Sequence, residues 1–184
     1  MSDSRSLDYL VLRQDGMTLE VVPVDQAFVA ATFAGLLKGA ALLTDYFGLH
    51  GRFPSVRTIL VPDRGEFDRC VAEVLRIQIE VPSHPARIGL PQGTNLVLLS
   101  PRAYVPGTNR YSPEGYERLI GHELTHIVEE LLSPNIEALP RWWSKGLAMH
   151  LSGDWLEEAA QVREGVVAGR IPALLDGALC GHAL

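Results

Sequence analysis

The feature that most constrains the fold is a long amphipathic helix expected at residues 113–132. Ser112-Pro113-Glu114 is a strong helix start, because serine can accept hydrogen bonds from free N–H groups, proline fits the first turn and glutamate favours the positive end of the dipole. Apolar side chains then recur three and four residues apart, at Ile120, Leu124, Ile127 and Leu131. A helix with one such stripe must bury it, so we expect it to pack against the core.

The rest of the chain predicts strands mainly in the first half and helices in the second. Strands are expected at 9–12, 17–22, 56–61, 77–81, 86–90 and 95–99, and further helices at 25–47, 66–75, 140–151 and 154–167. We therefore predict an α+β fold with a small mixed or antiparallel sheet packed on the helix at 113–132. Because the chain has 184 residues, 47% of them hydrophobic, we expect a single domain over 1–184 with a loose tail at 1–7.

Composition also excludes some functions. The formal net charge of −6, without a cluster of lysine and arginine, argues against nucleic-acid binding. The apolar stretch 27–43 is interrupted by Lys38 and flanked by Asp25 and Asp45, which favours a buried helix over a membrane span. The first residues do not resemble a signal sequence, so the cytoplasm is the default location.

The two cysteines do not suggest a structural role. Cys70 and Cys180 lie far apart and form no CxxC pattern, so we expect neither a disulfide framework nor a thiolate metal cluster. Both are interpreted as plain thiols.

The helix at 113–132 carries the sequence HELTH at 122–126 on a face away from the apolar stripe. Residues four apart on a helix project side by side, so His122 and His126 can share one metal ion. Glu123 projects between the histidines and the stripe, where a carboxylate can take a proton from a water that the metal activates. This arrangement is typical of zinc hydrolases and predicts Zn²⁺ as the cofactor.

A catalytic zinc site also needs a third protein ligand. The segment 139–150, LPRWWSKGLAMH, resembles the second signature of the gluzincin metallopeptidases, the thermolysin-like clan, in which a Pro-x-Trp-x-x-Glu-Gly-Leu-Ala-x-Tyr helix follows the first motif. The resemblance covers about residues 117–153. It implies a zincin-like fold, in which an edge strand such as 95–99 can hold an extended peptide by main-chain pairing. It also implies that the third ligand is the glutamate of the second signature.

This chain has Lys145 where the family has that glutamate, and His150 where the family usually has tyrosine. A lysine ammonium has three donors and no acceptor, so it repels zinc unless it is deprotonated. Three interpretations follow. Zinc binds through the two histidines with a substitute third ligand or extra water, or the ammonium replaces the ion and bridges Glu123 and the histidines, or Lys145 points elsewhere.

Other polar side chains are less suited to hold the metal directly. His150 lies about 140° further round its helix than Lys145, so it does not simply inherit the ligand position, although it can approach the cleft as a polar group. Glu130 extends the histidine row, but a straight helix carries it about 12 Å from His122. We therefore expect Glu129 and Glu130 to support the site or to lie on the surface.

The sequence thus predicts a zinc-dependent metallopeptidase that hydrolyses peptide bonds in a peptide or protein substrate. In that hypothesis His122 and His126 bind the metal and Glu123 is the general base. The alternative is an inactive pseudo-peptidase that binds a peptide or protein partner in the former cleft. Lys145 favours the alternative, whereas the intact Glu123 favours the enzyme.

Overall fold

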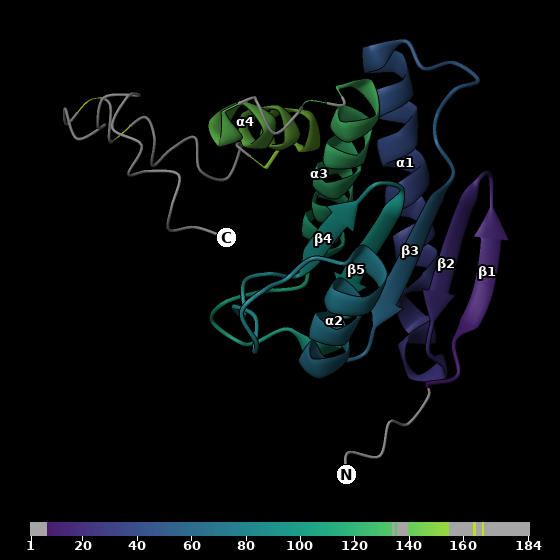
Figure 1. The fold of residues 1–184 in the computed structure, drawn as a ribbon, viewed down its shortest axis with the longest axis vertical. Helices are drawn as coiled ribbons and strands as arrows, with labels where there is room; N and C mark the ends of the chain where they lie inside the picture. Colours follow the sequence, from purple (N-terminus) through teal and green to yellow (C-terminus); the bar gives the residue numbers. More distant parts are fainter. Residues whose placement is uncertain (1–6, 134, 136–139, 155–163, 165–166, 168–184) are drawn as a thin grey trace.

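The computed structural model describes residues 7–133, 135, 140–154, 164 and 167. Within these residues, five strands form one mixed sheet in the order β1-β2-β3-β5-β4 (Figure 1). Their bounds are Leu10–Gln14 (β1), Met17–Val21 (β2), Val56–Val61 (β3), Gly89–Gln92 (β4) and Asn95–Leu99 (β5). Strands β2, β3 and β5 run parallel, and β1 and β4 are antiparallel edge strands.

Four α-helices in the described residues accompany the sheet. They are α1 (Val29–Phe47), α2 (Arg64–Cys70), α3 (Pro113–Leu132) and α4 (Arg141–Ser152). A 3₁₀ helix at Pro23–Phe28 precedes α1, a π-helical turn at Val71–Leu75 continues α2, and a short 3₁₀ helix lies at Pro101–Ala103. The molecule is therefore a mixed α/β fold, which is compatible with the expected α+β class.

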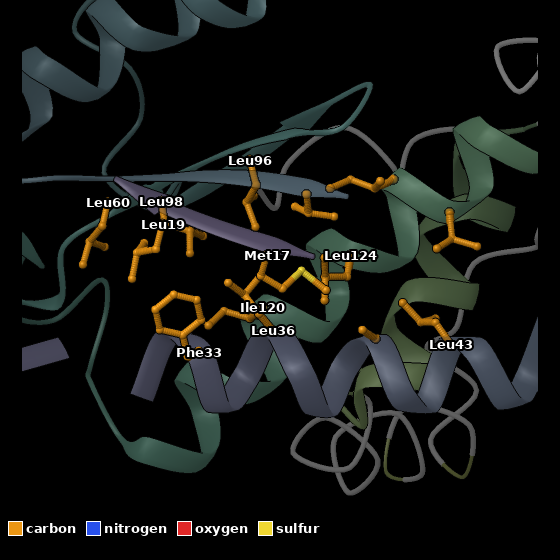
Figure 2. Close-up of a cluster of buried hydrophobic side chains, with 14 of the residues drawn as sticks. Met17, Leu19, Phe33, Leu36, Leu43, Leu60, Leu96, Leu98, Ile120 and Leu124 are labelled. Carbon is orange, nitrogen blue, oxygen red and sulfur yellow. The ribbon is translucent and has the colours of Figure 1, made fainter. Parts of the chain in front are cut away.

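The helices form layers on the sheet. Helices α1 and α3 cover one face and α2 covers the other, while α4 packs on α3 away from the sheet (Figure 1). Side chains of β2, β3 and β5 pack against α1 and α3 in the larger core, which includes Leu19, Leu36, Leu98, Ile120 and Leu124 (Figure 2). Because α3 is held in this core on one side, its other side is free to present polar groups to α4.

Two glycines allow α1 and α3 to approach closely. A Cβ atom at Gly35 would lie 2.7 Å from Ile120 Cδ1, and one at Gly39 would lie 2.8 Å from Leu124 Cδ1. Real Cβ atoms do not make such short contacts, so larger side chains at these positions would push the helices apart. The glycines therefore fix the position of α3 in the core.

The helical run Pro23–Phe47 is, within the described residues, long and apolar enough to cross a membrane by length and composition. A core helix of a soluble protein passes the same test. Here Leu36 and Leu43 of this run are buried against the sheet and α3, as expected for a core helix.

Several sequence predictions are confirmed. The hairpin of β1 and β2 turns at Asp15 and Gly16, whose φ angles of 47° and 81° suit a two-residue hairpin loop. The strands at 56–61 and 95–99 and the helix at 113–132 have the expected bounds. The helix expected at 140–151 is α4, which ends at Gly153 in the left-handed conformation.

Other predictions need correction. The run 77–81 is not a strand, and the strand expected at 86–90 begins later and is β4. The strand at 95–99 is β5, which lies between β3 and β4, so β4 and not β5 is the edge strand on this side of the sheet. Leu131 is 50% exposed, and the buried stripe ends instead at Ile127 and Val128. The tail at 1–6 and most of the helix expected at 154–167 lie outside the described residues.

Candidate metal centre

Helix α3 positions the candidate site. Ser112 begins the helix by accepting a hydrogen bond from the Gly115 N–H at 3.0 Å. The buried stripe then fixes the rotation of the helix, so that His122 and His126 lie on the side that faces α4. Their ring centroids are 5.0 Å apart, which is the side-by-side placement that the i, i+4 spacing predicts.

Each histidine contacts a carboxylate through the same ring nitrogen. His122 Nδ1 lies 3.1 Å from Oδ2 of Asp154, the second residue after α4, and His126 Nδ1 lies 3.0 Å from Glu129 Oε2. An ionised carboxylate can only accept, so Nδ1 carries the proton in each contact. A neutral ring then has its free lone pair on Nε2, which is the form that binds metal ions.

Asp154 is itself held by neighbouring charges. Its Oδ1 lies 3.5 Å from Arg118 Nε, and its backbone N–H donates to Ser152 Oγ at 3.3 Å. Burial alone would raise the pKa of Asp154, but hydrogen bonds from His122 and Ser152 and the charge of Arg118 bring it below the ordinary value. Asp154 therefore remains ionised and able to accept the His122 Nδ1–H.

Ser144 of α4 completes the surroundings of His126. Its hydroxyl donates to Glu129 Oε2 at 2.6 Å and lies 3.0 Å from His126 Nδ1. The serine and the glutamate contact the same nitrogen, so this is not a serine-protease relay, in which the histidine uses its two nitrogens separately. These contacts instead fix the ring and connect α4 to α3.

Glu123 is buried between the histidines and the sheet, with 8% of its surface exposed. Burial raises the pKa of this carboxyl, and the imidazoles, when they are protonated, and the charge of Lys145 oppose that shift. A Cβ atom at Gly89 of β4 would lie 2.8 Å from Glu123 Oε1. The carboxylate therefore lies against the beginning of the edge strand.

The two residues that depart from the gluzincin pattern differ in position. Lys145 is half-buried on α4, and its positive charge acts to lower the pKa of Glu123. His150 is exposed on the same helix. Among the described residues, no group of three His, Cys, Asp or Glu side chains could hold a metal ion.

The sequence singled out the two histidines and Glu123, and it predicted that Glu129 supports the site or lies on the surface; the structure places Glu129 beside His126. Asp154 was expected only as the first residue of the helix at 154–167, and Ser144 was not singled out. The sequence offers a signal for Glu129, which follows His126 by three residues on one helix. It offers none for Asp154, because that contact depends on how α4 packs against α3.

Comparison of the chain with protein-family models, with curated proteins and with solved structures finds no match. The function is therefore inferred from the geometry of the site and from the resemblance of the two sequence signatures to those of the gluzincins.

Proposed function

We propose that this protein is a zincin-like, gluzincin-type metallopeptidase in which His122 and His126 hold zinc and Glu123 is the general base. The observation that carries the proposal is the pair of Nδ1–carboxylate contacts, to Asp154 and Glu129. Histidines that bind metals usually donate their other ring N–H in this way, because the contact fixes the tautomer and the ring orientation. Packing alone would not require a carboxylate beside Nδ1 of both rings.

The donor set fits zinc in part. The two imidazoles are suitable ligands, whereas Lys145 suits the third position only when it is deprotonated. When bound, zinc supplies a Lewis acid that polarises the scissile carbonyl and acidifies water. The chain itself contributes the oriented imidazoles and Glu123, which would accept the proton of the attacking water and transfer it to the leaving amine.

A second candidate function is a pseudo-peptidase that binds a peptide or protein partner without cleaving it. The specific observation in its favour is that the charge of Lys145 acts on Glu123. A cation beside two histidines and a carboxylate can take the place of a metal ion. In that case the site would be stable without zinc, and the former active-site cleft would bind the peptide or protein partner.

Zinc titration of the metal-free protein separates these functions. The peptidase should bind about one zinc per chain, and saturation at a hundred times Kd should stabilise it by about 2.7 kcal/mol. It should also cleave peptides, and Glu123→Gln should abolish cleavage while zinc remains bound. Zinc content is measured by elemental analysis and stability by thermal unfolding, with His122→Ala as the control that cannot bind.

The Lys145→Glu variant makes the result decisive. If the natural protein binds no zinc but Lys145→Glu does, the scaffold is a zincin that one residue has inactivated, which excludes the zinc peptidase and favours the pseudo-peptidase. If neither protein binds zinc, the zincin interpretation of His122 and His126 is wrong.

A further inference from the structure

Gly89 makes an unusual contact with the proposed general base. A Cβ atom at this position would lie 2.8 Å from Glu123 Oε1 and 3.0 Å from both Cδ and Cγ of the same side chain. The φ angle of Gly89 is outside the left-handed region, unlike that of Gly93 at 57°. A side chain at position 89 is therefore opposed by its contact with Glu123 and not by the backbone conformation.

Neither partner in this contact can easily move away. The edge strand is paired with β5, and its turn is tied to α3, because Glu130 Oε2 accepts a hydrogen bond from the Gly93 N–H at 2.8 Å. Gln92 Nε2 also donates to Glu130 Oε1 at 3.3 Å. Glu123 itself is 8% exposed, and three atoms of its side chain lie against Gly89, so moving the carboxylate tip alone would not relieve the contact.

We infer that Gly89 is a positioning residue for Glu123: because it lacks a side chain, the carboxylate can lie between the edge strand and the two histidines. An alanine at position 89 would displace the carboxylate while leaving the imidazoles and their partners Asp154 and Glu129 untouched. The consequence for hydrolysis rests on the proposed function, whereas the positioning itself does not.

A double-mutant cycle tests the contact without any need for activity. In the natural background, Gly89→Ala should raise the unfolding equilibrium constant of the metal-free protein at least about tenfold. It should do the same in the Glu123→Gln background, because glutamine keeps the shape of the side chain. With Glu123→Ala the same change should have less than about a threefold effect, because the obstructing atoms are gone. Gly146→Ala is the matched control, since a Cβ there meets nothing within 4 Å.

If Gly89→Ala raises the unfolding equilibrium constant equally in all three backgrounds, the inference is overturned. If Gly89→Ala alone does not fold, folding of the double variant with Glu123→Ala supports the inference, and failure of both overturns it.

The kinetic constants distinguish a residue that positions Glu123 from a residue that only stabilises the fold. In a zinc-loaded, peptide-cleaving protein, Gly89→Ala should lower kcat at least about tenfold, with KM and zinc affinity unchanged within about threefold. A loss of zinc affinity instead would mean that the histidines had moved, which would overturn the inference. If the natural protein cleaves no peptide, the proposed function fails, while the cycle still decides the role of Gly89.

Discussion

At the scale of single residues, the site is defined by what each side chain contacts. The two imidazoles differ in their partners: Asp154 comes from beyond α4, and Glu129 from the same turn of α3. Both carboxylates act on Nδ1, so both would bias the rings toward the metal-binding form. The proposed function therefore predicts that removing either charge affects zinc binding more than it affects folding.

Asp154→Asn and Glu129→Gln should each weaken zinc affinity about 10- to 100-fold, because the neutral amides hold the ring tautomers less firmly. Competition with a chelating dye measures the affinity. Glu130→Gln is the matched control, since Glu130 lies on the same helix but bonds Gly93 in the turn between β4 and β5. Equal losses in all three variants would point to a general electrostatic effect and count against oriented imidazoles.

Cys70 provides a residue-scale prediction that is independent of zinc. Its side chain is 2% exposed, and burial raises the pKa of its thiol to about 11. At pH 8 about one thiol in a thousand is then ionised, so Cys70 should react with a disulfide reagent far more slowly in the folded protein than after denaturation. The assay uses a Cys180→Ser background. Rapid reaction of the folded protein would contradict the buried position of Cys70.

At the scale of elements, the contact between α1 and α3 determines where the site lies. Gly35 meets three side-chain atoms of Ile120, two residues before His122 along α3. The stripe of α3 and the glycines of α1 are therefore complementary surfaces. An error in their packing would rotate the histidines away from α4.

Gly35→Ala should lower the free energy of unfolding by about 1–3 kcal/mol, because the added methyl group overpacks the interface with Ile120. Alanine would otherwise favour a helix by up to about 1 kcal/mol over glycine, as expected at the exposed Gly146. Chemical denaturation of Gly35→Ala and Gly146→Ala should thus give changes of opposite sign. A stabilising effect of Gly35→Ala would show that the interface between α1 and α3 can accommodate the added methyl group.

Elements whose signals are local could be predicted from the sequence, and contacts between distant elements could not. Helix α3 has its serine cap, its proline and its apolar stripe within one segment, so its bounds were predictable. The run 77–81 has strand-forming residues but no strand beside it in the described sheet. The segment after it is held by contacts of α2: Ser83 N–H donates to Asp68, and Arg64 donates to Ser83 and to the Pro85 carbonyl.

At the scale of the whole molecule, the sheet separates two cores that stabilise different faces. The site belongs to the α1–α3 face, while α2 and the π-helical turn after it cover the other face with Phe67 and Val71. The segment before β1 is joined to that second face by Tyr9, whose hydroxyl donates to Glu66 Oε1 at 2.9 Å. Arg69 also bonds Glu66, so this carboxylate connects the beginning of the described chain to α2.

The Glu66 contacts predict a pH-dependent part of the stability. Hydrogen bonds from Arg69 are the main cause that lowers the pKa of Glu66, the hydrogen bond from Tyr9 adds to them, and burial opposes both. Because the folded pKa is below the unfolded value of about 4.3, this stabilisation is present above that value and is lost as the pH falls through the folded pKa. Arg69 is half exposed, which limits the effect to about 1 kcal/mol.

Glu66→Gln should therefore be less stable than the natural protein at pH 7, and the difference should shrink as the pH is lowered to 3, where the natural carboxyl is also becoming neutral. Urea denaturation at a series of pH values measures the difference. Glu73→Gln is the matched control, because Glu73 also pairs with Arg69 but is 59% exposed and should contribute almost nothing at any pH. A Glu66→Gln difference that stays constant or grows on acidification would mean that the charge of Glu66 does not stabilise the connection between the two segments.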